Sequence, residues 1–347
     1  MSVIKQPKIL VIGDLMIDHY LWGSANRISP EAPVQVVDID NESTVLGGAG
    51  NVVNNLRALG CSVGVISAIG KDEAGSELKT MLEDIDTLSY LIEQKNRKTS
   101  KKSRIIASHS QVIRYDKESK DDITEETSNA IFEEFKNILD GYDIVLLSDY
   151  GKGVLTAKLT QDLIEYANSQ NKKVLVDPKG EDYSKYGGAY LLTPNKKEAQ
   201  EASKININDD QSLQKALQTL KSTVSLEVSL ITLSKDGIAI LDQEGNICKK
   251  PTVAREVYDV TGAGDTILAS LGYCLAKDID IMSALEFANL AAGVVVGKLG
   301  SATATLEEIE AYKSSIASRI KTFKEIKETV EGLKNQGKRI VFTNGCF

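Results

Sequence analysis

Short apolar runs alternate with amphipathic helical patterns along most of the chain. The first pair is an apolar run at Lys8–Gly13 and a helical stripe from Asn51 to Leu59, which Gly60 ends. The alternation returns between residues 62 and 83 and again between 124 and 177. Strands that are apolar throughout are typical of parallel sheets with helices on both faces. The pattern therefore predicts an α/β protein with a mostly parallel sheet.

The same criteria give the remaining elements. Strands are expected at 62–69, 143–148, 173–177, 230–233 and 237–241, and helices at 74–83, 124–139, 156–169, 210–223, 264–276 and 283–298. Two stretches, 33–38 and about 88–114, contain successive strand-like runs without a helix between them. We expect them to form a small antiparallel β-flap at the edge of the sheet, a lid drawn from about 33–45 and 88–114.

The composition changes near the C-terminus. Residues 306–335 are rich in Lys and Glu with a helical pattern, and an apolar run follows at 338–343. The predicted organisation is a main domain at 1–315, a helical linker at 316–337 and a strand of a new unit at 338–347.

Composition and charge exclude several classes of protein. The 347 residues are 42% apolar and 26% charged, as in soluble globular proteins. The formal charge of -8 argues against nucleic-acid and anionic-membrane binding, so an anionic ligand needs a local cationic or dipolar site. No apolar run is long enough for a membrane span or signal peptide, so a cytoplasmic protein is expected. The scattered cysteines and two histidines predict neither a disulfide framework, nor a zinc site, nor a Ser-His-Asp hydrolase.

The strongest chemical signal is the run from Asp259 to Asp265, Asp-Val-Thr-Gly-Ala-Gly-Asp, directly before an apolar helix. Its glycines and the helix N-terminus favour a bound anion such as a phosphate. A carboxylate at Asp265 suits a kinase that removes a proton from an attacking hydroxyl. The alternative is an aspartate that caps a helix after a glycine turn.

Further candidates lie at the expected carboxyl edge of the sheet. Asp14 and Asp18 fall on one side of an extended segment and suit sugar hydroxyls, although Asp14 equally suits a turn cap. The cluster at 47–51 allows close approach of a ligand, or is a flexible loop before a helix. Asn195 and Glu198 suit Mg²⁺-bound water and phosphates, or a capping box.

Two other expected strands end in an acid followed by a lysine, at 148–153 and 177–180. These segments could bind a sugar phosphate, or they could be ordinary surface loops. Basic residues also gather in the flap, where Lys102 and Arg104 share a strand face and suit a phosphate monoester. The alternative is a solvated charged edge that discourages aggregation.

Taken together, these motifs resemble the ribokinase (PfkB) family of sugar kinases. The resemblance is strongest to its heptose-7-phosphate kinases, which form one half of a bifunctional enzyme of ADP-heptose synthesis. The matching runs are 13–18, 27–33, 147–153, 177–180, 191–195, 256–265 and 291–300. They extend over about residues 8–310, and the runs at 27–33 and 148–153 indicate heptose kinases rather than the family at large. The implied fold is a ribokinase-like three-layer sandwich with a mostly parallel sheet and a small β-flap as lid.

The resemblance implies ATP-dependent phosphorylation of D-glycero-β-D-manno-heptose 7-phosphate at its anomeric C1 hydroxyl. The 1,7-bisphosphate formed would serve ADP-heptose and lipopolysaccharide core synthesis. Asp265 would be the general base, with amides of Gly262, Ala263 and Gly264 as the anion hole. Asn195 and Glu198 would organise Mg²⁺ and the phosphates, Glu198 through water. The resemblance also allows K⁺ near Asp259 and a homodimer made by pairing two flaps.

The remaining candidates fall into three groups. Nucleotide contacts are implied for Thr232, Ser234, Lys235, Gly237 and Asn289. Sugar contacts are implied for Asp18, Gly47, Gly48, Asn51 and Asp149, and spacing adds Asp14. Candidates for the 7-phosphate, chosen by charge alone, are Lys102, Arg104, Arg114, Lys152 and Lys179.

Residues 338–347 resemble the first strand of the adenylyltransferase half, and no HxGH motif follows. We therefore expect that adenylyl transfer is not encoded here and is supplied by a missing domain or another chain. Two alternatives remain: a kinase of another sugar, such as fructose phosphate, ribose or a nucleoside, and a catalytically silent sugar or nucleotide sensor. The run at 27–33 argues against the first, and the intact Asp265 with its glycine loop argues against the second.

Overall fold

The computed structural model describes residues 6–107, 110–242, 244–253, 257–298, 300–319, 323–335 and 337–341. It divides into a large unit, residues 1–305, and a small unit, residues 306–347. The small unit contains the helices α9 (Leu306–Arg319) and α10 (Phe323–Asn335). The strand expected at 338–347 is not formed at 338–341, and its remainder lies outside the described residues. Within the described ranges, no helix has the length and apolar character needed to cross a membrane.

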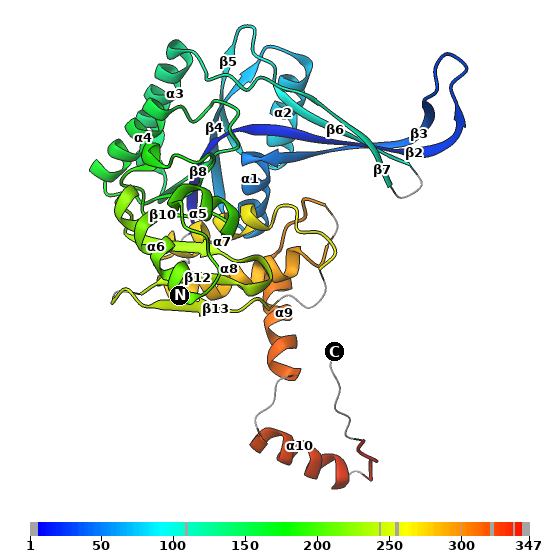
Figure 1. Cartoon of the computed structure of the whole chain (residues 1–347), viewed down its shortest axis with the longest axis vertical. Helices are drawn as coiled ribbons and strands as arrows, with labels where there is room; N and C mark the ends of the chain where they lie inside the picture. Colours follow the sequence, from blue (N-terminus) through cyan, green and yellow to red (C-terminus); the bar gives the residue numbers. More distant parts are fainter. Residues whose placement is uncertain are drawn as a thin grey trace. The chain divides into compact units, whose positions relative to one another are not determined.

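A nine-stranded sheet forms the centre of the large unit, in the order β13-β12-β11-β10-β9-β8-β1-β4-β5 (Figure 1). The strands from β11 to β5 are parallel, and β12 and β13 are antiparallel. The strands are β1 (Lys8–Gly13), β4 (Ser62–Gly70), β5 (Leu88–Gln94), β8 (Ile144–Ser148), β9 (Val174–Asp177), β10 (Leu191–Leu192), β11 (Val228–Thr232), β12 (Ile238–Leu241) and β13 (Ile247–Lys250).

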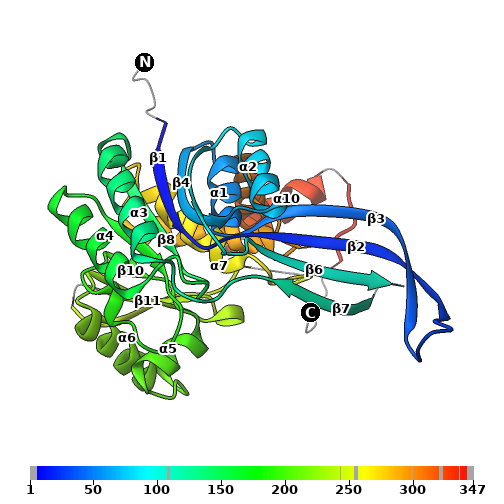
Figure 2. The same cartoon turned by 90° about the horizontal axis from the view of Figure 1, so that it is seen from above.

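Helices cover both faces of this sheet (Figure 2). Helices α1, α7 and α8 lie on one face and α3, α4 and α6 on the other. The alternate residues of β1 show why both faces need a helical layer. Leu10 and Ile12 belong to the core cluster that contains Phe135 and Leu163. Ile9 and Val11 are equally buried and face the opposite layer. The helices are α1 (Ala49–Ala58), α2 (Glu73–Asp84), α3 (Glu125–Ile138), α4 (Ala157–Ser169), α5 (Lys196–Ser203), α6 (Asp210–Val224), α7 (Ala263–Leu275) and α8 (Ile281–Val295), with 3₁₀ turns at Leu139–Gly141, Ser184–Tyr186 and Ser234–Asp236. The predicted three-layer α/β fold is confirmed.

A second sheet of four strands projects from the body, in the order β3-β2-β6-β7 (Figures 1 and 2). We call it the lid; its strands are β2 (Leu15–Ile28), β3 (Gln35–Gly48), β6 (Ser100–Ala107) and β7 (Ser110–Lys117). Strands β2 and β6 pair in parallel, and the two outer pairs are antiparallel.

The lid differs from the expected flap in three respects. Residues 88–94 belong to the central sheet as β5 and not to the lid. Strand β2 is a full member although no strand was expected at 15–28, and its pairing with β6 makes the sheet mixed rather than antiparallel. Strand β5 has a polar pattern because it is the edge strand of the central sheet, with one side open to solvent.

Candidate active site

A glycine turn begins α7 at the carboxyl edge of the central sheet. Gly262 precedes the helix with φ of +79°, a conformation that favours glycine, and no described side chain caps the first turn. A Cβ on Gly264 would meet no described atom within 4 Å, so the helix start is open there. The Ala263 amide instead donates to the carbonyl of Val260 at 3.3 Å. An anion beside Gly264 would therefore have space and a favourable helix dipole, whereas the Ala263 amide already has a hydrogen-bond acceptor.

Asp265 lies in the first turn of α7 and is buried. Its Oδ2 accepts a hydrogen bond from Asn51 Nδ2 at 2.7 Å, and its Oδ1 accepts one from the Tyr150 hydroxyl at 2.8 Å. Burial raises the pKa of Asp265 to about 6, against the lowering effect of these two donors. A carboxylate with such a pKa is ionised near neutral pH and is suited to accept a proton.

Asn51, in the first turn of α1, faces Asp265 from across the site. Its side chain is buried, and its Oδ1 has no hydrogen-bond partner among the described residues. A buried amide oxygen without a donor is costly, so a ligand hydroxyl at this point would be favourable. Glycine is required opposite, because a Cβ on Gly262 would lie 2.7 Å from Asn51 Nδ2.

Asp18 extends from β2 beneath the lid. Its Oδ1 accepts a hydrogen bond from Arg104 Nη1 at 2.7 Å, and the carboxylate is buried. A Cβ on Gly47 would come within 2.3 Å of Asp18 Oδ2, and Gly48 has φ of +57° with a Cβ position 2.5 Å from the Asp14 carbonyl. The two glycines therefore make room for the carboxylate and the turn into α1.

Asp14 fixes the loop that follows β8. Its carboxylate accepts hydrogen bonds from the amides of Tyr150, Lys152 and Val154 at 2.9, 3.0 and 3.1 Å. Burial raises its pKa, and these amides oppose the effect. Asp14 was expected to bind a sugar together with Asp18; three backbone amides already bind its carboxylate, which leaves it less capacity for a sugar hydroxyl.

Asp149 is likewise committed to internal contacts. Its Oδ2 accepts from Lys185 Nζ at 2.6 Å and from the Tyr186 hydroxyl at 2.8 Å, and its Oδ1 accepts from the Gly151 amide at 2.8 Å. It borders the cleft described next, but these contacts leave less capacity for a sugar hydroxyl than the sequence suggested.

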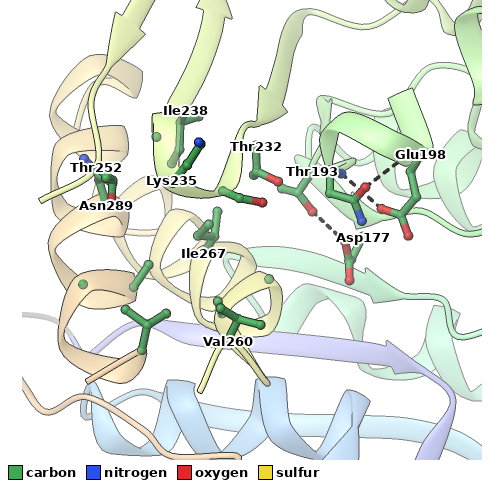
Figure 3. Close-up of a pocket in the computed structure, with 18 of the residues that line it drawn as sticks. Asp177, Thr193, Glu198, Thr232, Lys235, Ile238, Thr252, Val260, Ile267 and Asn289 are labelled. Carbon is green, nitrogen blue, oxygen red and sulfur yellow. Dashed lines mark hydrogen bonds between the residues drawn. The ribbon is translucent and has the colours of Figure 1, made fainter. Parts of the chain in front are cut away.

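A cleft of about 660 Å³ opens beside the start of α7 (Figure 3). Apolar side chains line one part of it and polar groups the other. Of the predicted nucleotide residues it includes Asn195, Glu198, Thr232, Ser234, Lys235, Gly237 and Asn289, and also Ala263 and Gly264. These residues come from four separate segments of the chain, and the fold brings them to one cavity.

One wall of the cleft is the N-terminus of α5. Asn195 Oδ1 accepts from the Glu198 amide at 3.0 Å, and Glu198 Oε2 accepts from the Asn195 amide at 3.1 Å, which is a capping box. The capping box that was the alternative interpretation of this pair is therefore formed, and the same two residues also border the cleft. Glu198 Oε1 also accepts from Lys179 Nζ at 3.0 Å.

The opposite wall comes from β12 and α8. Gly237 has φ of +89°, and a Cβ there would lie 2.0 Å from the Lys250 carbonyl, so glycine is required. Asn289 Nδ2 donates to the Pro251 carbonyl at 2.6 Å. Ile238, Ile267 and Val260 supply apolar surface between them, as Figure 3 shows.

The basic candidates differ in the partners they already have. Arg104 is paired with Asp18, Arg114 with Asp116, Lys152 with Glu118 and Lys179 with Glu198. Lys102 alone among the five has no carboxylate partner in the described parts of the chain, and its ammonium lies 5.8 Å from the Tyr150 ring centre. Burial lowers the pKa of Lys102; the charge of Asp18 opposes this effect, and those of Lys152 and Arg114 add to it.

One residue of the site was missed, and another was noted only as an acid at the end of a strand. Tyr150 stood inside a quoted motif, but its bond to Asp265, 115 positions away, leaves no mark in the sequence. Asp177, at the end of β9, borders the cleft and accepts from Thr193 Oγ1 at 3.0 Å. Burial, with the charges of Asp265 and Glu198, raises its pKa well above the ordinary value. Its place at the carboxyl end of a parallel strand was the available signal.

Metal binding has limited support from protein ligands. The described residues contain no cluster of three or more histidine, cysteine or carboxylate side chains. Asp259, beside which K⁺ was expected, accepts from the amide and hydroxyl of Thr261 at 2.9 and 2.7 Å and from the Gly300 amide at 3.0 Å. These contacts tie together the two loops that flank the glycine turn.

Comparison with known proteins gives a family for the whole large unit. The profile described as "pfkB family carbohydrate kinase" matches residues 6–309. The chain is 63% identical over 349 residues to "Bifunctional protein HldE" of Aliarcobacter butzleri, covering 99% of this chain and 73% of that protein. It is 56% identical over 355 residues to the protein of the same name from Sulfurimonas denitrificans, covering 100% of this chain and 74% of that protein.

Solved structures share the fold at lower identity. Phosphofructokinase-2 from Escherichia coli in complex with potassium has a TM-score of 0.74 at 19% identity, covering 90% of this chain and 99% of that chain. Arabidopsis thaliana ribokinase complexed with ribose and ATP has a TM-score of 0.68 at 17% identity, covering 89% of this chain and 99% of that chain.

Proposed function

We infer the reaction from one premise: this chain belongs to the pfkB family of carbohydrate kinases, which transfer a phosphoryl group from ATP to a sugar hydroxyl. As the acceptor we propose D-glycero-β-D-manno-heptose 7-phosphate, phosphorylated at its anomeric C1 hydroxyl to the 1,7-bisphosphate. The residue runs that resemble heptose kinases support this acceptor, as does the high identity to proteins named HldE. The product would be used in ADP-heptose and lipopolysaccharide core synthesis.

The observation that carries the proposal is the buried carboxylate of Asp265 at the open start of α7. Asp265 accepts the proton of the C1 hydroxyl as its oxygen attacks the terminal phosphorus of ATP. The helix N-terminus beside Gly264 stabilises charge on the transferred phosphoryl group. Asn51 Oδ1, which lacks a donor among the described residues, accepts a hydrogen bond from the sugar.

ATP fits the cleft by size and by chemistry. A volume of about 660 Å³ with an apolar wall at Ile238, Val260 and Ile267 suits a purine, and Lys235 adds a cation at its edge. Mg²⁺ neutralises charge on the phosphates when it is bound. Asp177 and Glu198 border the cleft and would be the carboxylates that hold it, Glu198 through water. A K⁺ ion near Asp259 is part of the same proposal.

The 7-phosphate is assigned to the underside of the lid. Lys102 supplies a half-buried ammonium without a carboxylate partner among the described residues, and Lys152 and Arg114 lie near enough to influence it. Arg104 is held by Asp18 and orients that carboxylate toward a sugar hydroxyl. We also propose that two lids pair in a homodimer, since apolar side chains such as Trp22 and Ile113 are exposed there.

The test of the general base is Asp265→Asn. A neutral amide cannot accept the proton, so we expect turnover to fall by a factor on the order of 10² to 10⁴ while ATP affinity stays the same. The variant should fold, because it removes a buried charge. Calorimetric ATP binding and a melting curve provide the controls. Undiminished turnover in a folded variant would refute the role of Asp265.

The acceptor is tested separately in an ATP-consumption assay with heptose 7-phosphate, fructose 6-phosphate and ribose. We expect the highest kcat/KM with the heptose, and ³¹P NMR should place the new phosphate at C1. A preference for either of the other sugars would leave the kinase activity in place and show that the proposed acceptor is wrong.

A further inference from the structure

Resting on the proposed role of Asp265 as general base, we propose that Tyr150 is a positioning residue that orients the Asp265 carboxylate and stabilises its ionised form. The proposal includes Asp14, which fixes the loop that carries Tyr150. Neither function was expected from the sequence, where Asp14 was considered as a sugar ligand or a turn cap.

The first argument is the geometry around the base. The Tyr150 hydroxyl donates to Oδ1 of Asp265 and Asn51 donates to Oδ2, so each carboxylate oxygen has one donor. The donors come from different elements, the loop after β8 and helix α1, and they fix the plane of the carboxylate between them. Each oxygen keeps a further lone-pair site, so a sugar hydroxyl can still approach.

The second argument is that Tyr150 is always a donor. Burial raises the pKa of its hydroxyl well above the ordinary value, and the charges of Asp265 and Asp177 act in the same direction. The hydroxyl therefore keeps its proton at all working pH values and presents it to Asp265. A hydrogen bond to a carboxylate favours the charged form, whereas burial disfavours it.

Three charged groups and one tyrosine among the described residues act on Asp265. Asp18 on β2 raises its pKa, and Lys102 on β6 lowers it. Asp177 on β9 interacts with it as a like charge. With the protonated Tyr150 on the β8 loop, these groups set the pH at which the base becomes active.

The third argument concerns the loop itself. The three amides bound by Asp14 include that of Tyr150, and the guanidinium of Arg97 donates to the Lys152 carbonyl from the other side. Gly153 adopts φ of +86°, where a Cβ would lie 2.2 Å from the Asp121 carbonyl. The backbone around Tyr150 is thus fixed at several points, which is what a side chain needs in order to orient another one.

The test is Tyr150→Phe, measured as the pH profile of kcat/KM for the heptose. Loss of a donor to the carboxylate should shift the acid limb by about one unit toward higher pH. The loss of kcat/KM should then be greatest on the acid limb and shrink above it. A second readout without turnover is a ¹³C NMR titration of the aspartate carboxyl groups, with the Asp265 signal identified by its loss in Asp265→Asn.

Tyr183→Phe is the matched control, because Tyr183 is also buried and its hydroxyl has no partner among the described residues. It should leave both titrations unchanged. If Tyr150→Phe does not fold, 3-fluorotyrosine at position 150 gives the opposite test: a stronger donor should shift the acid limb to lower pH. Asp14→Asn should reproduce the direction of the Tyr150→Phe shift.

The outcomes separate this proposal from the proposed function. An Asp265 titration and an acid limb that stay in place in Tyr150→Phe, or that move equally in Tyr183→Phe, would overturn the positioning role while leaving Asp265 as the base. Full turnover in Asp265→Asn would overturn the base itself, whatever the tyrosine variants show.

Discussion

At the scale of single residues, ion pairing separates the basic side chains that are free to bind a ligand from those that are not. A surface ion pair contributes little to stability, but it occupies both partners. Arg114 and Asp116 form such a pair on the exposed face of β7. Lys102 lies half-buried on the neighbouring strand and forms no ion pair with a carboxylate among the described residues, so its ammonium remains available to a phosphate.

This difference gives a prediction about substrate binding. We expect Lys102→Ala to raise KM for heptose 7-phosphate roughly 10- to 100-fold, the cost of one hydrogen bond to a charged group, with little change in KM for ATP. Arg104→Ala should also affect the sugar more than ATP, because it releases Asp18. Lys117→Ala, at an exposed lysine of the neighbouring strand β7, is the control and should change both constants less than threefold. Steady-state kinetics would decide, and equal effects of Lys102→Ala on both substrates would contradict the assignment.

Residues of this kind were predictable to different degrees. Asp265, Asn195 and Glu198 stand in motifs whose spacing already indicates a chemical use, and the structure brings the first to a helix start and the other two to the cleft. Tyr150 was not predictable, because its function depends on a contact between distant positions. Asp14 was expected on a sugar or as a turn cap, and its bonds to the amides of the loop after β8 were not predictable, because they join positions that are distant in the sequence.

At the scale of elements, the start of α5 serves two purposes. Its capping box satisfies backbone donors that the helix would otherwise leave free, and the same two side chains face the cleft. The chain contains a second capping box at α6, formed by Asp209 and Ser212, which is absent from the residues lining the cleft. The pair of boxes separates the contribution of a cap to stability from its contribution to nucleotide binding.

We therefore expect Asn195→Ala and Asp209→Ala to lower the free energy of unfolding by similar amounts, about 0.5–2 kcal/mol each. Only Asn195→Ala should raise KM for ATP in the presence of Mg²⁺, because only it releases Glu198 at the cleft. Urea unfolding and steady-state kinetics measure the two effects. An equal rise of KM in both variants would mean that helix stability alone is responsible.

The predictability of elements follows the physical origin of each signal. Strand β1 is buried on both faces and helix α4 on one face. The sequence predicts both elements because each kind of burial requires its own spacing of apolar residues. Strand β2 escaped detection because its first half is buried and continues the apolar run of β1, while its second half extends into solvent with polar residues. Strand β5 was assigned to the lid because an edge strand has the same mixed pattern as a lid strand.

At the scale of the whole molecule, the lid is a thin sheet that exposes apolar side chains within the part of the large unit that the structure describes. Trp22 is 43% exposed and Ile113 is 53% exposed, and β3 and β7 are the open edges of the sheet. Exposed edges and apolar side chains together invite pairing with another sheet. A second copy of the lid presents the same surface, and a two-fold arrangement satisfies both copies at once.

We predict that the chain is a dimer and that Ile113→Lys on the edge strand β7 converts it to a monomer, because a charge would be buried in the contact. Leu88→Lys is the control: Leu88 is 60% exposed but lies on β5 of the central sheet, so it should leave the dimer intact. Size-exclusion chromatography with light scattering measures both. Since the lid also carries Lys102, loss of the dimer should raise KM for the sugar phosphate more than KM for ATP. A monomeric wild-type protein, or an Ile113→Lys variant that stays dimeric, would contradict pairing through this sheet.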